Sequence, residues 1–442
     1  MSIIMSTSRG PHSYDRLRDV PVKRENVGGV ATGLRGIMES IGGKWVCWGD
    51  GTMDSRFQHE DMGKYSIERV MLSQREKKGY YDEYSNSVLW PLFHYFREKI
   101  EYDSKSYEQY ESVNKKFASE IAKVSQAGDI IWIHDYQLSL VPGMLREMGI
   151  QNKIIFTWHI PWVASEFYFL LPERDQLIKS ISQSDSITFH TMDYARNFIS
   201  SVARSTGSSD SVKSRVHSIP LGIDYRRFNQ YRRDHSLRKK HGKSIIFSID
   251  RLDYSKGLVN RAQSIEYFIR KYPEYREKFT FIMVVTPSRS NISGYEEIKD
   301  NLEMNIGRIN GLYGSINWMP IVYMYRRLSQ GQLLNYYYNA DVALITPLKD
   351  GLNLVAEEFV ATTERGILVI SEFAGVSDYL SESITVNPNS TMDIADKLKL
   401  ALDMSDEERM KRLKVMKEFI IKHDDRWWAK KVLGTLKGSK RP

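Results

Sequence analysis

Short apolar runs rich in β-branched residues alternate along the chain with longer stretches in which apolar residues recur at helical spacing. Seven of the runs are predicted strands, at residues 129–133, 153–158, 186–189, 244–249, 280–285, 341–345 and 367–370. Predicted helices lie between them, for example at residues 138–148, 258–272 and 391–403. Buried strands separated by helices are typical of parallel βαβ units. The pattern therefore predicts an α/β protein with doubly wound parallel sheets.

Two breaks in this pattern suggest how the chain is divided. Polar and basic residues replace the apolar periodicity around residues 203–218 and again around 231–243. At about 150 residues per domain, 442 residues make about three units, or two large ones. We predict an N-terminal domain over 1–236, a second domain over 237–418 and a C-terminal helical segment over 419–442.

The composition is that of an ordinary globular protein, with 41% hydrophobic and 27% charged residues. It excludes a disordered, collagen-like or disulfide-rich chain. The single cysteine, Cys47, excludes an internal disulfide and a cysteine-based zinc cage, and it fits a reducing compartment. The first five residues are too short for a signal peptide, and no apolar run reaches about 18 residues. We therefore expect a cytoplasmic protein with no membrane partner.

Lysine and arginine exceed aspartate and glutamate by 63 − 55 = 8 charges, which favours anionic ligands in general. Charge alone does not distinguish nucleic acids from small phosphates. The densest basic run, residues 238–243, lacks the interleaved aromatic residues that stack on bases. We interpret it as a solvated linker and predict no nucleic-acid partner.

Ligands of open parallel sheets bind beyond the carboxyl ends of the strands, and several predicted strands here end in polar sequence. Arg251 and Lys256, a planar fork and a flexible point charge, could clamp a diphosphate or could be two surface cations. Asp350 and Gly351 precede a predicted helix whose first N–H groups could bind phosphate or hydroxyl oxygens, although Asp350 could equally be a plain N-cap. Glu358, about two turns into that helix, could bind a ribose diol or face solvent.

Other motifs restrict the chemistry further. His134 and His159 follow predicted strands, but no third ligand at metal spacing accompanies them, so we predict no metal site. Asp135, beside His134, indicates a polar pocket of the kind that binds sugars. The usual nucleotide loops are missing, because Leu237 stands where a P-loop needs its first glycine and Asp54 where a dinucleotide fingerprint needs its third.

Taken together, these segments resemble the trehalose-6-phosphate synthase family, retaining glycosyltransferases of GT-B architecture. The resemblance runs from about residue 3 to residue 430 and rests on motifs in register, at residues 132–136, 159–161, 189–191, 251–257, 286–289, 307–311 and 350–356. It implies two Rossmann-like domains facing across a cleft, with residues 419–442 returning to the N-terminal domain. The family's usual Ser-Asn-Arg reads Thr7-Ser8-Arg9 here, and Val30 replaces a leucine, so we expect an altered acceptor pocket near Ser8 and Val30.

The resemblance also implies a role for each matching position. The implied donor-binding residues are Gly29, His159, Arg251, Lys256, Asp350, Gly351, Leu352, Asn353, Leu354 and Glu358. The implied acceptor-binding residues are Arg9, Tyr81, Trp90, Asp135 and Arg289. Those implied in catalysis are Asp135, His159, Arg251, Lys256 and Asp350.

By the same resemblance, glucose passes from UDP-glucose to glucose 6-phosphate, giving α,α-trehalose 6-phosphate and UDP by metal-independent front-face attack. No cofactor is implied beyond the donor itself. The partners are the two small-molecule substrates, and the sequence leaves room for a homo-oligomer. Two alternatives stay open: a related transferase or pseudo-glycosyltransferase with another nucleotide sugar or acceptor, and a non-catalytic sugar-phosphate sensor.

Overall fold

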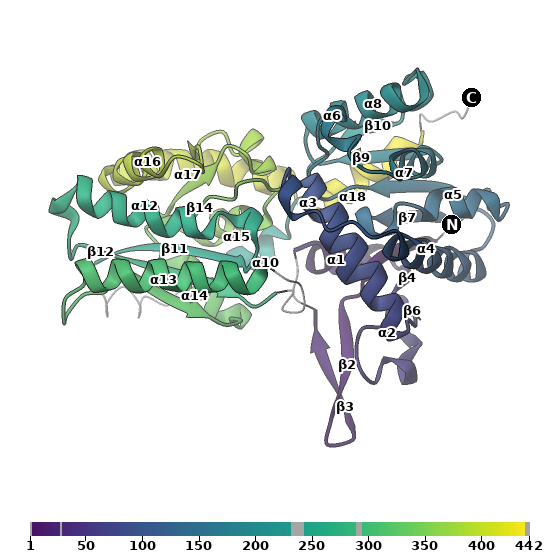
Figure 1. Cartoon of the computed structure of the whole chain (residues 1–442), viewed down its shortest axis with the longest axis horizontal. Coiled ribbons are helices and arrows are strands. Elements are labelled where there is room, and N and C mark those ends of the chain that lie inside the picture. Colours follow the sequence, from purple (N-terminus) through teal and green to yellow (C-terminus); the bar gives the residue numbers. More distant parts are fainter. Residues whose placement is uncertain (1, 27–28, 231–242, 289–293, 438–442) are drawn as a thin grey trace. The chain divides into compact units, whose positions relative to one another are not determined.

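The chain folds into two compact units (Figure 1). The structure, a computed structural model, describes residues 2–26, 29–230, 243–288 and 294–437. Unit 1 comprises Met1–Leu221 and Asp425–Pro442, and unit 2 comprises Gly222–Asp424. The boundary predicted between residues 236 and 237 falls in 231–242, outside the described residues.

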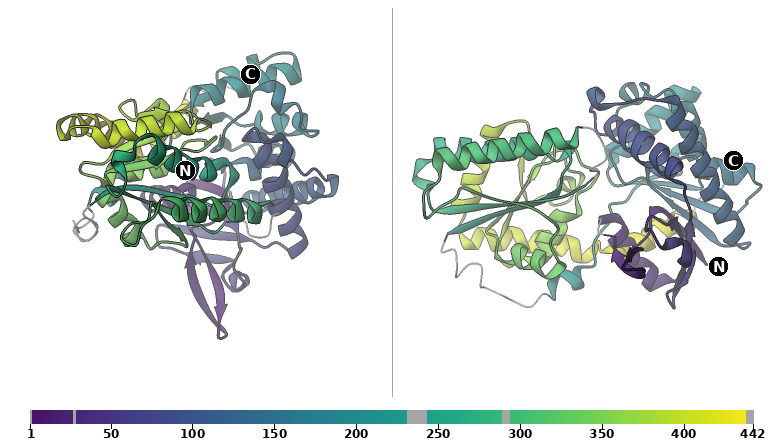
Figure 2. Two further views of the ribbon diagram at one scale, coloured as in Figure 1. Left: turned by 60° about the vertical axis from the view of Figure 1, so that its left-hand side comes forward. Right: turned by 60° about the horizontal axis from the view of Figure 1, so that its bottom comes forward.

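An eight-stranded sheet forms the centre of unit 1, and its strands are parallel except for the edge strand β5, which is antiparallel to β6. In spatial order the strands are β10 (Val216–Ser218), β9 (Ser186–Phe189), β8 (Lys153–Thr157), β7 (Ile130–His134), β1 (Ile3–Arg9), β4 (Gly43–Trp48), β6 (Tyr65–Val70) and β5 (His59–Asp61). The hairpin of β2 (His12–Leu17) and β3 (Val20–Glu25) extends away from this sheet (Figure 2).

Helices surround the sheet of unit 1. They are α1 (Gly29–Ile41), α2 (Gln74–Lys77), the π-helix η2 (Lys78–Leu89), α3 (Trp90–Phe93), α4 (Ser104–Val124), α5 (Val141–Glu147), α6 (Ser165–Tyr168), α7 (Arg174–Ile181), α8 (Met192–Thr206), α9 (Asp210–Lys213) and α18 (Asp425–Gly434). Helix α18 is joined to β7 by aromatic packing, because the rings of Trp428 and Trp132 lie 5.1 Å apart and both are fully buried. The last segment of the chain therefore completes the core of the first unit.

A six-stranded, fully parallel sheet forms the centre of unit 2. Its spatial order is β13 (Ile321–Tyr325), β12 (Phe279–Thr286), β11 (Ser244–Arg251), β14 (Val342–Ile345), β15 (Ile367–Ser371) and β16 (Ile384–Val386). Its helices are α10 (Tyr225–Asn229), α12 (Leu258–Lys271), α13 (Tyr295–Tyr313), α14 (Gln330–Asn339), α15 (Leu354–Thr362), α16 (Thr391–Asp403) and α17 (Asp406–Lys422).

Both faces of the second sheet are buried, as the continuous apolar strands predicted. Ile246 of β11 belongs to a core cluster that includes residues of α12, α13 and α16. The next residue, Phe247, points to the other face and stacks on Tyr336 of α14, with 5.1 Å between the ring centroids. The predicted α/β class with parallel sheets is confirmed.

The predicted elements agree closely with those observed, with one helix shorter than expected. All seven predicted strands occur, and so do helices α12 and α16. The helix expected over 138–148 spans only Val141–Glu147, because Tyr136–Leu138 forms a separate 3-10 turn. Pro142 in the first turn of α5 suits a helix start and not a helix interior.

Each sheet has a switch point, where the chain stops adding strands on one side of its first strand and continues on the other side. In unit 1 it builds from β1 through β4 to β6 and then continues on the other side of β1, from β7 to β10. In unit 2 it builds from β11 to β13 and then continues on the other side of β11, from β14 to β16. Ligands of such folds bind at the carboxyl ends of the strands beside this switch point. These points are β1/β7 in unit 1 and β11/β14 in unit 2.

Candidate active site

At the switch point of unit 2, the loops after β11 and β14 bring together two predicted site residues. Lys256 Nζ lies 2.6 Å from Asp350 Oδ2, and both side chains are largely buried. Asn353 Nδ2 donates to the same Asp350 oxygen over 2.9 Å. Residues 94 positions apart in the sequence thus form one charged cluster.

Close backbone packing holds these two loops together. Gly257 has a φ of +62°, and a Cβ atom at that position would lie 2.5 Å from the carbonyl oxygen of Thr346. A glycine is therefore required directly after Lys256. The N–H of Leu348 donates to the carbonyl of Ser255 over 2.7 Å, which ties the two loops at a second point.

A buried arginine supports the cluster from inside the unit. The Arg261 side chain is fully buried and pairs with Asp250 over 2.8 Å. It also donates to Thr346 Oγ1 and to the carbonyl of Lys256, each over 3.0 Å. Burial raises the pKa of Asp250, while the charge of Arg261 opposes that effect. One side chain thus links the end of β14 to the loop that carries Lys256.

The N-cap of α15 is Asn353 and not Asp350, which leaves the Asp350 carboxylate for Lys256. Asn353 has a φ of 87°, and its Oδ1 accepts the N–H of Ala356 over 3.1 Å. Gly351 and Leu352 are buried in the preceding turn, and Leu354 is the first residue of the helix. The positive end of α15 therefore lies directly beside the Lys256 and Asp350 pair.

Two further predicted donor residues flank this cluster. Arg251 is the exposed last residue of β11. Glu358 lies on α15 and accepts a hydrogen bond from Tyr337 Oη over 3.1 Å. Burial raises the pKa of the Glu358 carboxyl to about 7, although the Tyr337 hydrogen bond and the charge of Arg227 favour its ionised form.

At the switch point of unit 1, Asp135 follows β7 and His159 follows β8. The N–H of His159 donates to Asp135 Oδ1 over 3.2 Å. Asp135 has a φ of 73°, which is unusual for a residue with a side chain, and its N–H donates to the carbonyl of Thr157 over 2.8 Å. Strained backbone of this kind concentrates at functional sites.

His159 is the middle member of a buried row of three histidines. The N–H of Leu221 donates to Nδ1 of His190, so His190 carries its proton on Nε2 and donates to Nδ1 of His159. His159 in turn donates from Nε2 to Nδ1 of His134 over 2.9 Å. Burial lowers the pKa of His134 to about 3 and that of His159 well below its usual value. Both His159 ring nitrogens are therefore engaged, and the ring stays neutral at neutral pH.

Arg9, the last residue of β1, lies among aromatic rings. Its guanidinium carbon is 4.8 Å from the centroid of Tyr81 and 5.8 Å from that of Trp48. Arg9 also pairs with Asp50 over 3.6 Å, and Asp50 accepts a hydrogen bond from Ser13. The Arg9 side chain is 43% exposed, so the guanidinium remains accessible to an anion.

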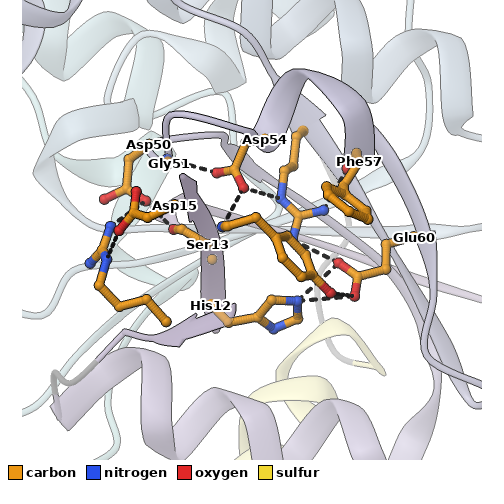
Figure 3. A network of polar contacts seen from close by, with 12 residues as sticks. His12, Ser13, Asp15, Asp50, Gly51, Asp54, Phe57 and Glu60 are labelled. Atoms are coloured by element: carbon orange, nitrogen blue, oxygen red, sulfur yellow. Dashed lines mark hydrogen bonds and ion pairs between the residues drawn. The ribbon is translucent and has the colours of Figure 1, made fainter. Parts of the chain in front are cut away.

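A polar network anchors the β2–β3 hairpin (Figure 3). The Arg69 side chain is fully buried between Asp54, at 3.8 Å, and Glu60, at 2.7 Å. Glu60 also accepts hydrogen bonds from Tyr14 and His12. Although burial alone would raise it, these three partners lower the pKa of Glu60 to about 2. The base of the hairpin is thus fixed by ionised groups.

Three predicted site residues remain: Trp90, Gly29 and Arg289. Trp90 is buried, with its ring 6.0 Å from that of Tyr136. Gly29 is the first residue of α1. Arg289 lies outside the described residues.

Sequence reasoning missed several residues that support the site: His190, Asp50, Asp250 and Arg261. The only available signal for Asp250 was its position directly after the predicted strand 244–249. Asp50 had no such signal, because the strand that precedes it, Gly43–Trp48, was not predicted. His190 occurs in a quoted motif, at residues 189–191, but nothing in one sequence shows that it contacts His159. Arg261 has the appearance of an ordinary helix cation.

The described residues lack two features, a cluster of metal ligands and a membrane-spanning helix. Within these ranges, no three histidine, cysteine, aspartate or glutamate side chains lie where they could hold a metal ion. None of the helices described combines the length and the apolar character needed to cross a membrane.

Two Rossmann-like sheets with polar clusters at their switch points define a two-domain α/β enzyme scaffold that binds ligands beyond its strands. The family model described as glycosyltransferase family 20 matches residues 6–438, and the chain belongs to this family.

Relatives and solved structures agree with this family. The chain is 37% identical to the bifunctional trehalose-6-phosphate synthase/phosphatase of Thermoproteus tenax over an alignment of 471 positions, covering all of this chain and 64% of that protein. The chain thus spans about two thirds of this relative. The trehalose-6-phosphate structure from E. coli bound with UDP-2-fluoro glucose matches with a TM-score of 0.90 and 31% identity, covering 100% of both chains. The α,α-trehalose-phosphate synthase (UDP-forming) of Burkholderia xenovorans in complex with glucose-6-phosphate matches with a TM-score of 0.91 and 29% identity, covering 99% of this chain and 100% of that one.

Proposed function

We propose that this chain transfers glucose from UDP-glucose to glucose 6-phosphate, forming α,α-trehalose 6-phosphate and UDP with retention of the donor configuration. The observation that carries the proposal is the Lys256 and Asp350 pair beside the start of α15, at the switch point of a Rossmann-like sheet. The names of the relatives and the ligands in the two solved structures support the same substrates.

The donor binds to unit 2 in this proposal. Arg251 and Lys256 hold the diphosphate, because a guanidinium fork and an ammonium are the groups suited to phosphate oxygens. Asp350 and the first N–H groups of α15 hold the glucose, and Glu358 accepts the ribose hydroxyls. Gly29 is a further residue that we assign to the donor phosphates.

Unit 1 provides most of the residues that we assign to the acceptor. Arg9 binds the sugar phosphate, Tyr81 and Trp90 surround it, and Asp135 accepts from its hydroxyls. Arg289, which lies outside the described residues, is assigned to the same phosphate. Arg9 suits this role because it is held by two aromatic rings and one carboxylate while its guanidinium stays accessible.

Both ring nitrogens of His159 are hydrogen-bonded to other histidines, so the group that His159 contributes to the site is its backbone N–H. The histidine row fixes the loop whose N–H holds Asp135.

The reaction needs no proton from a histidine. The bond between the glucose anomeric carbon and the UDP phosphate oxygen breaks, and the anomeric hydroxyl of the acceptor attacks the same face. The proton of that hydroxyl passes to the departing phosphate oxygen. Arg251 and Lys256 stabilise the negative charge that develops there, which is an electrostatic role that positioned cations can perform without a metal.

The proposal is tested by an activity panel that crosses UDP-, GDP- and ADP-glucose with glucose 6-phosphate, glucose and other hexose phosphates. Nucleotide release measures turnover, and mass spectrometry with NMR identifies the product and its linkage. We expect the highest kcat/KM for UDP-glucose with glucose 6-phosphate and an α,α-1,1 linkage in the product. Turnover with a different pair only would favour a related transferase, and ligand binding without nucleotide release would favour a sensor.

A pH dependence of donor binding follows from Glu358. Its pKa near 7 means that the carboxyl gains a proton as the pH falls through neutrality, and a protonated carboxyl cannot accept from both ribose hydroxyls. We expect the KM for the donor to rise below pH 7, approaching about tenfold per pH unit. Steady-state kinetics between pH 5.5 and 8.5 measures this.

Matched variants isolate the contribution of Glu358. Glu358→Gln should raise the donor KM at pH 8 and remove its dependence on pH. Glu364→Gln is the control, because Glu364 of the same unit also accepts a tyrosine hydrogen bond, from Tyr338, but has no proposed contact with substrate. A pH profile that stays the same in Glu358→Gln would contradict the ribose assignment.

We also propose a cytoplasmic location, which the single, buried thiol of Cys47 suits.

A further inference from the structure

Trp48 lies beside two cations and not one. The guanidinium carbon of Arg9 is 5.8 Å from the Trp48 ring centroid, and Lys77 Nζ is 5.6 Å from it. Tyr81 joins the group, with its ring 5.5 Å from Trp48 and 4.8 Å from the Arg9 guanidinium. Cations at these distances from an aromatic ring are attracted to its face.

Lys77 and Tyr81 lie on the same face of the helical segment formed by α2 and η2. Lys77 is the last residue of α2, which continues without a break into η2, where Tyr81 lies four residues further on. Helical residues at this spacing are neighbours on one face. Because Tyr81 also contacts Arg9, the two cations belong to one surface patch, which we call the Trp48 patch (Arg9, Trp48, Lys77 and Tyr81).

The charges around Lys77 leave it uncompensated. Lys78 pairs with Glu83 over 3.4 Å, and Glu76 pairs with Lys116 over 2.6 Å. Among the residues that the structure describes, no carboxylate lies within 4.0 Å of the Lys77 ammonium. Lys77 is nevertheless half-buried, whereas the Lys78 side chain is 73% exposed.

Arg9, in contrast, is already partly neutralised. Asp50 lies 3.6 Å from Arg9 and also 3.6 Å from Arg24, so one carboxylate serves two guanidinium groups. The Trp48 patch therefore has an excess of positive charge. The charge of Lys77 contributes to this excess, because no carboxylate of the described residues pairs with it.

We propose that Lys77 is a further cation for the phosphate of the acceptor, in addition to the arginines already assigned to it, and that it strengthens the preference for a phosphorylated over an unphosphorylated sugar. This inference rests on the proposed function. A phosphate monoester carries about 1.5 to 2 negative charges at neutral pH, and Arg9 is already partly neutralised by Asp50. Both cationic groups lie within about 6 Å of the Trp48 ring, and Arg9 is the residue already assigned to this phosphate.

The variant Lys77→Met tests this, because methionine keeps most of the apolar stem but removes the charge. We expect its KM for glucose 6-phosphate to rise about tenfold or more, as for a lost hydrogen bond to a charged group, with kcat changed much less. Any turnover with unphosphorylated glucose should keep its KM. Lys78→Met is the matched control and should behave as the unchanged protein.

Inorganic phosphate provides a readout that does not depend on catalysis. Calorimetric titration of phosphate into the full chain, without donor, should show binding about tenfold weaker in Lys77→Met than in Lys78→Met. If the chain proved not to use glucose 6-phosphate, this titration would still test the Trp48 patch as an anion site.

Two results would overturn the proposal. One is an unchanged phosphate affinity together with an unchanged KM for glucose 6-phosphate in Lys77→Met. The other is an equal rise of KM for phosphorylated and unphosphorylated sugar, since that would assign Lys77 a role in packing and not in recognition of charge.

Discussion

Replacing Lys256 by alanine is expected to lower kcat/KM by about a hundredfold or more while leaving the fold intact. The ammonium group of Lys256 is held 2.6 Å from Asp350 in a largely buried loop, so it is already positioned before charge develops on the departing phosphate. Removing one such positioned donor typically costs about 2.7–4 kcal/mol of transition-state stabilisation. Steady-state kinetics with saturating acceptor measures the effect.

A control in the same unit separates this effect from a general loss of charge. Lys271 ends the helix that follows Lys256, but its side chain is 37% exposed and pairs with Asp396 at the surface. Lys271→Ala should retain normal kcat/KM, and both variants should show the circular dichroism and melting behaviour of the unchanged protein. Near-normal turnover in Lys256→Ala would refute its assignment to the leaving phosphate.

Replacing the buried Arg261 by methionine should give the largest loss of stability. The variant leaves the Asp250 carboxylate buried without its ion pair, and breaking a buried pair from one side typically costs about 3–5 kcal/mol of unfolding free energy. It also removes the hydrogen bonds to Thr346 and to the carbonyl of Lys256. Activity should therefore fall as well, because the loop carrying Lys256 loses its support.

Urea unfolding combined with hydrogen exchange of peptides from residues 244–271 locates this loss in unit 2. The loss should shrink in mildly acidic buffer, because Asp250 can then take up a proton and bury no charge. Arg308→Met is the control, since Arg308 pairs with Glu266 at the surface and its removal should hardly move the unfolding midpoint. Equal stability of Arg261→Met and Arg308→Met would contradict the structural role of Arg261.

The fold could be predicted from sequence largely because its strands are buried on both faces. Continuous apolar runs such as residues 280–285 have few other interpretations when helical stretches separate them. The hairpin β2–β3 gave no such signal, because its strands are mostly polar and exposed. The π-helix η2 could not be foreseen either, since its wider turn has no distinct pattern in twelve residues.

The candidate site was predictable where residues directly follow strands, and less so where support comes from elsewhere. Lys256 and Asp350 stood out by position, and the structure joins them. The N-cap of α15 was harder, because Asp350 and Asn353 are both good caps and only the φ of 87° at Asn353 separates them. The direction of the hydrogen bonds along the histidine row is set by the N–H of Leu221, and no sequence pattern identifies this donor.

The way Trp428 packs on Trp132 has a consequence for how the protein is made. Unit 2 is one continuous segment of chain, whereas unit 1 needs its last helix from residues beyond 424. During synthesis the core of unit 1 therefore cannot be completed until residues beyond 424 have been made. A nascent chain halted before residue 425 would be a natural target for chaperones that bind exposed aromatic side chains, because unit 1 would lack Trp428.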